Sequence, residues 1–87
     1  MWIWYRENAM VKSYTYRVII EPDGKQFHGY VPALPGCHTF GTNLEETRKN
    51  LRDAIGLYLE SLQSLGEKAP EDRSFETFET VTTPMHA

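Results

Sequence analysis

Cysteine is nearly absent from this sequence, because Cys37 is the only one among 87 residues. A lone cysteine cannot close an intrachain disulfide, so a disulfide-stapled fold is excluded. No stretch approaches the roughly 18 consecutive apolar residues of a membrane-spanning helix. The first residues also lack the basic-then-apolar order of a signal peptide. We therefore expect a protein of the reducing cytoplasm without a membrane span.

Motifs for metal binding and catalysis are missing as well. There is no Cys-x-x-Cys or His-x-x-x-His spacing, no phosphate-binding glycine loop and no dinucleotide fingerprint. Cys37 and His38 are adjacent, so on a strand their side chains face opposite ways and cannot meet at one metal ion. His28 could approach across a hairpin, but nothing in the sequence requires it. We expect no catalytic residue, no bound metal, no cofactor and no enzymatic activity.

Basic side chains are outnumbered, with nine lysines and arginines against twelve acidic residues and a net charge of -3. This balance argues weakly against nonspecific nucleic-acid binding, because phosphate contacts need lysine and arginine. Residues 1–52 hold seven basic and five acidic side chains, a net of +2, whereas residues 53–87 hold two and seven, a net of -5. The second half is either an ordinary solvated acidic surface or a face offered to a basic partner.

Eleven aromatic residues and a hydrophobic content of 40% suffice for the core of one small domain. Alternating apolar and β-branched residues over 14–21 predict a strand. The Glu-Pro-Asp-Gly sequence at 21–24 predicts a hairpin turn into a second strand over 26–31. Two prolines and a glycine make 32–36 a fixed loop, and a short third strand is expected over 37–40.

A long amphipathic helix is expected over residues 44–65, about 33 Å in length. Asn43 is placed to cap it, with Glu46 completing a capping box, and Gly66 suits the position just after its end. Residues 74–81 are rich in phenylalanine, threonine and valine and could form a final strand. The alternation there is weak, because the two phenylalanines are three residues apart.

These elements predict a two-layer α+β fold of β-β-β-α-β order, with a three-stranded antiparallel sheet, one covering helix and a short C-terminal strand. We expect an N-terminal extension over 1–13, a single domain over 14–82 and a tail over 83–87. One helix covers only one face of the sheet, and the other face would carry apolar side chains such as Ile19 and Tyr30. We therefore expect a homodimer or higher oligomer.

The beginning of the chain permits two interpretations. Met10 is a candidate alternative start, in which case residues 1–9 are an extension. Alternatively, the segment is a short strand or arm that buries Trp2 and Trp4 against another chain. The sequence does not choose between them.

Charged side chains supply two candidate binding surfaces. The first half of the helix carries a small basic group, a possible nucleic-acid patch whose alternative is a solvated helix face. The second half of the chain carries acidic residues that could contact a basic partner, or could simply be solvated. The basic group is Arg48, Lys49 and Arg52, and the acidic candidates are Glu60, Glu67, Glu71 and Asp72.

Four short motifs follow one another in a distinctive order, the most specific being a Leu-Pro-Gly-Cys segment followed by a glycine and a Leu-Glu-Glu helix start. They are Val18–Gly24, Phe27–Pro32, Leu34–Gly41, and Leu44–Glu46 with Asn50–Ile55. In this order and spacing they resemble the HicB family of antitoxins and HicB-like proteins. The resemblance covers about residues 14–65, and the final strand matches more loosely.

The resemblance implies a partial RNase H-like fold of β-β-β-α-β order, despite whose name such family members are not nucleases. It also implies a partner, a small basic HicA-like toxin that cleaves mRNA and is neutralised by direct binding. Many HicB antitoxins continue into a DNA-binding domain, but the residues after the last predicted strand are too few for one, so we do not expect operator binding. The alternative to an antitoxin is a solitary HicB-like module that binds RNA or another ligand.

Overall fold

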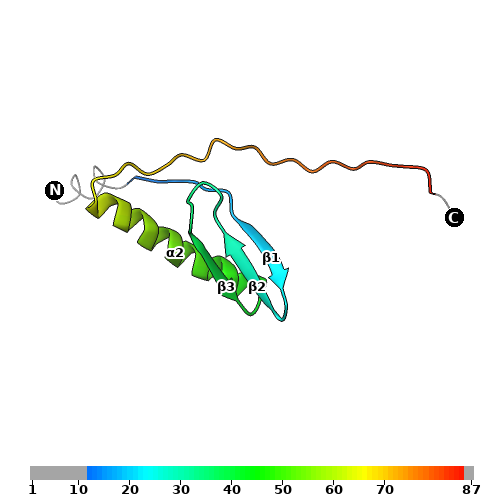
Figure 1. Ribbon diagram of the computed structural model, residues 1–87, viewed down its shortest axis with the longest axis horizontal. Helices are drawn as coiled ribbons and strands as arrows, with labels where there is room; N and C mark the ends of the chain where they lie inside the picture. Colours follow the sequence, from blue (N-terminus) through cyan, green and yellow to red (C-terminus); the bar gives the residue numbers. More distant parts are fainter. Residues whose placement is uncertain (1–11, 86–87) are drawn as a thin grey trace, which may run out of the picture.

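Three short antiparallel strands and one long helix form the regular structure of residues 12–85, the part of the chain that the computed structural model describes (Figure 1). The sheet has the order β1-β2-β3, and α2 packs against one of its faces. The two interpretations of residues 1–9 lie outside the described residues. The element bounds are β1 Ile19–Asp23, β2 Gln26–Tyr30, β3 His38–Gly41 and α2 Leu44–Ser64. The predicted α+β fold, with its three-stranded antiparallel sheet and long helix, is confirmed.

The first hairpin turns at Gly24 and Lys25, so β1 includes Pro22 and Asp23 and ends two residues later than the predicted strand. Gly24 has a φ of +65°, and a glycine at the first position of a two-residue loop suits the twist of the flanking strands. Pro22 is tolerated because β1 is an edge strand, where a proline need not donate a ladder hydrogen bond.

Strand β1 is also shorter at its start than the predicted strand over 14–21. Ile19 lies opposite Tyr30, so the residue before it would have to pair with Val31. At that point β2 has ended and Pro32 has begun the loop, which removes the partner strand. The alternation at 14–18 is real in the sequence, but without a partner those residues form no ladder.

The loop between β2 and β3 is fixed by main-chain hydrogen bonds. The Val31 amide donates to the Cys37 carbonyl at 3.1 Å, and the amides of Leu34 and Cys37 donate to the carbonyls of Val31 and Leu34 at 3.0 Å. Leu34 is fully buried at the centre of this loop. The loop is therefore fixed, as its two prolines and glycine predicted, and it also supplies Leu34 to the core.

Helix α2 begins and ends close to the predicted residues. The Asn43 side chain accepts a hydrogen bond from the Glu46 amide at 2.7 Å, while the Glu46 carboxylate accepts from the Thr42 amide at 2.8 Å. The expected capping box is thus displaced by one residue on its return side. Gly66 has a φ of +72°, and its amide and that of Glu67 donate back to the last turn in a Schellman motif.

The core lies between the first half of α2 and the sheet. Its buried apolar residues are Val31, Leu34, Cys37 and Leu51. Two glycines allow the close approach of the helix. A Cβ atom at Gly29 would lie 2.6 Å from Leu51 Cδ1, and one at Gly41 would lie 2.7 Å from the Thr47 backbone nitrogen. The helix therefore packs directly on the strand backbones.

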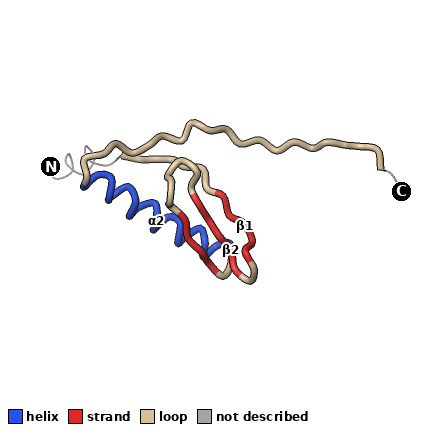
Figure 2. Tube along the Cα trace, viewed as in Figure 1, coloured by secondary structure: helices blue, strands red, loops and turns tan. Residues whose placement is uncertain are grey.

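Beyond α2 the chain runs extended to the end of the described residues, without joining the sheet (Figures 1 and 2). The short C-terminal strand predicted over 74–81 is therefore wrong for this chain by itself, since no strand of the described residues lies beside that segment. Phe75 and Phe78 are 95% and 90% exposed. We call residues 75–85 the arm.

Candidate interaction surfaces

The face of the sheet that α2 leaves open carries a cluster of rings. Because Gly29 faces the helix, its neighbours His28 and Tyr30 face the opposite way. The register places Phe40 across from His28, and His38 across from Tyr30. Four ring-bearing side chains from two strands therefore share this open face, which also includes Ile19, as expected from the sequence.

His28 is the centre of the ring cluster. Its ring centroid lies 4.8 Å from that of Phe40, 5.2 Å from that of His38 and 5.7 Å from that of Tyr30. Its Nε2 atom is 3.3 Å from His38 Nδ1, so one neutral ring can donate a hydrogen bond to the other. Within residues 12–85 no group of three potential ligands could hold a metal ion. The chemistry of this face is that of an aromatic contact surface.

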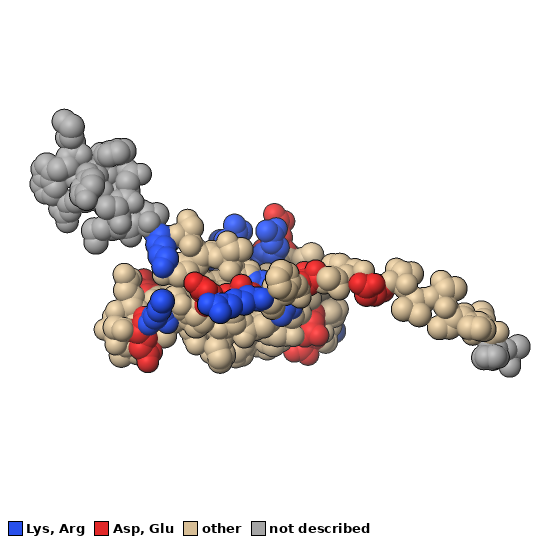
Figure 3. All heavy atoms as spheres, turned by 90° about the horizontal axis from the view of Figure 1, so that it is seen from above, with Lys and Arg blue, Asp and Glu red and all other residues tan. Residues whose placement is uncertain are grey.

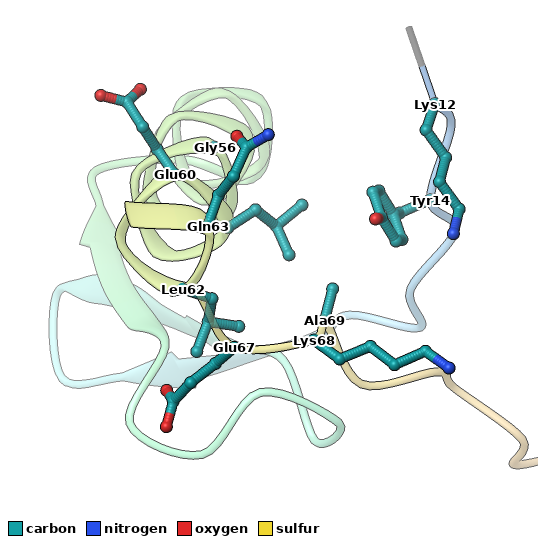
Figure 4. Close-up of a pocket in the computed structure, with 10 residues that line it drawn as sticks. Lys12, Tyr14, Gly56, Glu60, Leu62, Gln63, Glu67, Lys68 and Ala69 are labelled. Atoms are coloured by element: carbon teal, nitrogen blue, oxygen red, sulfur yellow. The ribbon is translucent and has the colours of Figure 1, made fainter. Parts of the chain in front are cut away.

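A groove of about 440 Å³ lies between the second half of α2 and the segment that precedes β1 (Figure 4). Leu59 and Leu62 line it from the helix, and Tyr14 lines it from the opposite side. Glu60, Glu67, Lys12 and Lys68 also line it, and the carboxylates of Glu60 and Glu67 point away from Tyr14 toward the outside of the groove (Figure 4).

Two of the four acidic candidates, Glu60 and Glu67, line this groove. The Glu71 carboxylate instead pairs with Arg73 at 3.2 Å. Asp72 accepts hydrogen bonds from the Arg17 amide at 2.7 Å and from the amide and hydroxyl of Ser74, which lower the pKa of its carboxyl to about 2. Asp72 therefore holds the segment after α2 against the segment that precedes β1, through its hydrogen bond from the Arg17 amide.

The basic candidates Arg48, Lys49 and Arg52 are exposed on the first half of α2. Lys49 lies 3.9 Å from Asp53, one turn further along the helix. Figure 3 shows lysine and arginine interspersed with aspartate and glutamate over the face seen from above. This mixture of signs gives no broad basic surface on that face of the kind that follows a phosphate backbone.

The ring cluster and the arm were not among the predicted binding residues. The ring cluster was accessible to sequence reasoning, because His28, Tyr30, His38 and Phe40 have equal parity on two predicted strands. The arm was not predicted as an exposed segment, because its composition is that of a strand and predicted a place in the sheet.

Comparisons by sequence and by structure find relatives of this chain. The sequence model of the family described as HicB_like antitoxin of bacterial toxin-antitoxin system matches residues 16–84. A UPF0150 protein of Thermoplasma acidophilum is 44% identical over 62 residues, covering 70% of this chain and 90% of the relative. A UPF0150 protein of Thermotoga maritima is 45% identical over 49 residues, covering 56% of this chain and 65% of the relative.

A solved structure, described as a HicA3 and HicB3 toxin-antitoxin complex, matches with a TM-score of 0.60 and 27% identity, over 69% of this chain and 70% of that one. The fold defines a small α+β protein in which one long helix covers one face of a three-stranded antiparallel sheet. This chain belongs to the HicB-like antitoxin family. Within residues 12–85, no helix combines the length and the apolar character needed to cross a membrane.

Proposed function

We propose that this protein is the antitoxin of a type II toxin-antitoxin system and neutralises a small basic HicA-like toxin that cleaves mRNA. The observation that carries the proposal is the match to a chain of a HicA3–HicB3 toxin-antitoxin complex, together with the family membership. Inhibition by direct binding needs only a complementary surface. It is therefore compatible with a chain that presents aromatic and acidic side chains rather than an arranged set of reacting groups.

We propose the second half of α2 as the part that meets the toxin. Glu60 on the helix and Glu67 just after its end are both exposed, and neither takes part in an ion pair among the described residues. Carboxylates in such positions accelerate association with a basic protein by long-range attraction, and this effect is screened by salt. Glu71 and Asp72 contribute less to binding, because one is paired and the other is bonded to main-chain amides.

The test is coexpression with a HicA-like toxin from the same genome, with growth and copurification as readouts. The unchanged chain should relieve growth arrest and copurify with the toxin. The double variant Glu60→Lys/Glu67→Lys should lose about tenfold or more in affinity at low salt. The matched control Glu21→Lys/Glu45→Lys makes the same change in net charge at two exposed residues outside the groove and should bind as the unchanged chain does.

Absence of both rescue and complex would refute the toxin-neutralising role. The alternative module, which binds RNA without a toxin, would then predict salt-dependent RNA binding that is lost on replacing Arg48, Lys49 and Arg52. The pairing of Lys49 with Asp53 argues against that alternative, because it neutralises part of the patch.

A further inference from the structure

We propose that the arm of one copy of this chain adds as a fourth strand to the open edge of β1 in a second copy. Two copies would exchange arms about a two-fold axis. This inference goes beyond toxin binding, and it concerns a contact that the protein makes with itself. It rests on the exposure of the arm, on the way its root is fastened, and on the free edge of β1.

The arm exposes apolar side chains that a soluble chain has little reason to display. Phe75, Phe78, Val81 and Met85 are 95%, 90%, 78% and 97% exposed, and all four belong to one continuous extended segment. Between them stand Thr77, Thr80, Thr82 and Thr83, residues that also favour strands. A segment of this composition favours the strand conformation and, without a ladder partner, is suited to pair with the exposed edge of a sheet.

Residues 70–74, which precede the arm and form its root, are hydrogen-bonded to the domain. These bonds fix the direction in which the arm leaves the domain. The Tyr16 hydroxyl donates to the Pro70 carbonyl at 2.7 Å, and the Arg17 amide donates to the Asp72 carboxylate at 2.7 Å. The Arg17 side chain also donates to the Ser74 hydroxyl at 3.1 Å. After Ser74 the chain departs from β1 instead of following it (Figure 2). Its partner strand therefore lies on another molecule.

Strand β1 offers the complementary edge. A two-residue hairpin loop closes on a hydrogen-bonded pair, here Asp23 and Gln26. Alternation along an antiparallel ladder then leaves Ile20 with both main-chain groups directed away from β2. Pro22, at the next outward position, offers a carbonyl only. Since β1 is an edge of the sheet, these groups have no ladder partner within the described chain.

The length of the arm and the incomplete packing around β1 are both compatible with pairing at this edge. Residues 75–82 span about 26 Å when extended, which exceeds the roughly 17 Å of the five residues of β1. Helix α2 packs mainly on β2 and β3 and little on β1, so Ile20 is only half-buried on the helix side. A phenyl ring carried by an added strand would cover that gap.

The binding partner of the arm is best explained as a second copy of this chain. Each chain has one arm and one free β1 edge, so in a two-fold symmetric dimer each arm pairs with the β1 edge of the other copy. The domain does not need its own arm, because residues 75–85 add no buried side chain to the core. A chain that ends at Ser74 therefore retains every core contact and the fastened root.

Sedimentation equilibrium at about 50 µM, without toxin, compares the full chain with a chain ending at Ser74, with Phe75→Ser/Phe78→Ser and with the control Met85→Ser. We expect dimers for the full chain and for the control, and monomers for the other two, all with the same helical circular dichroism. A monomeric full chain, or a dimer that survives removal of the arm, would overturn the proposal. The second result would assign association to the ring cluster instead.

Hydrogen exchange then locates the recipient edge. The Ile20 amide should exchange about tenfold or more slowly in the full chain than in the chain ending at Ser74, because an added strand accepts its hydrogen bond. Equal exchange in a dimeric full chain would place the arm elsewhere and refute the β1 edge. Protection of the Ile20 amide in a monomeric full chain would show that the arm pairs with its own β1, which also contradicts exchange between copies.

Discussion

The imidazoles of His28 and His38 meet on the open face of the sheet, with Nε2 of the first 3.3 Å from Nδ1 of the second and their ring planes at 67°. The two residues are ten positions apart in the sequence and come together only because the β2–β3 register pairs His28 with Phe40 and His38 with Tyr30. The contact joins the two strands on the side that α2 does not cover.

Removing the centre of this ring cluster should weaken the domain measurably. His28 contacts three other rings and is half-buried, whereas His38 is exposed. We expect His28→Ala to lower the free energy of unfolding by about 1 kcal/mol, since a pair of aromatic rings contributes on that order. Urea denaturation followed by circular dichroism measures it. His38→Ala is the matched control and should cost less, and an equal cost for both variants would contradict the central role of His28.

The close approach of α2 to the sheet gives a sharper test. An added methyl group at Gly29 would meet Leu51, and one at Gly41 would meet the Thr47 main chain. We expect Gly29→Ala and Gly41→Ala each to destabilise the domain by about 1–3 kcal/mol, because overpacking displaces neighbours. Gly56 has nothing within 4 Å of such a Cβ, so Gly56→Ala should stabilise the helix by about 0.5–1 kcal/mol. Thermal melting measures the three variants. A melting temperature of Gly29→Ala or Gly41→Ala equal to or above that of the unchanged chain would contradict the close packing of α2.

The elements that the sequence predicted well are those governed by local rules. Asn43 and Gly66 act at the two ends of α2 through hydrogen bonds within a few residues, so their types are informative without tertiary context. Strand limits were predicted less well, because a strand exists only where a neighbour lies beside it. This is why 14–18 and 74–81 have the composition of strands and yet join no ladder in this chain.

For the candidate site, too, the sequence predicted what depends on residue type but not what depends on tertiary contacts. Glu60 and Glu67 were placed on an exposed surface by counting charge, and they do line one groove. Asp72 looked equivalent in the sequence, but a carboxylate that caps its own turn cannot be distinguished from a free one without the contacts to Arg17 and Ser74. Residue type alone does not indicate which partner a carboxylate has.

Asp72 should therefore give the fastening of the arm a dependence on acid. Its pKa is held at about 2 by hydrogen bonds from Ser74 and the Arg17 amide, below the usual value of 3.8. A carboxyl with a lowered pKa stabilises the fold above its unfolded pKa, and this contribution is lost as the pH falls through about 2. The Arg17 amide resonance should titrate with a midpoint near that value. Asp72→Asn should abolish the titration, whereas Glu71→Gln should leave it unchanged.

The thiol of Cys37 should be inert in the folded protein. It is 5% exposed within the core, and burial raises the pKa of the thiol, which leaves less of the nucleophilic thiolate at neutral pH. We expect modification by a thiol reagent at pH 8 to be at least tenfold slower in buffer than in urea, because reaction then requires opening of the core. Gly29→Ala should accelerate the reaction in buffer in proportion to its loss of stability. Gly56→Ala should slow it or leave it unchanged. Rapid modification of the unchanged chain in buffer would contradict the burial of Cys37, and with it the packing of the 32–36 loop beneath α2.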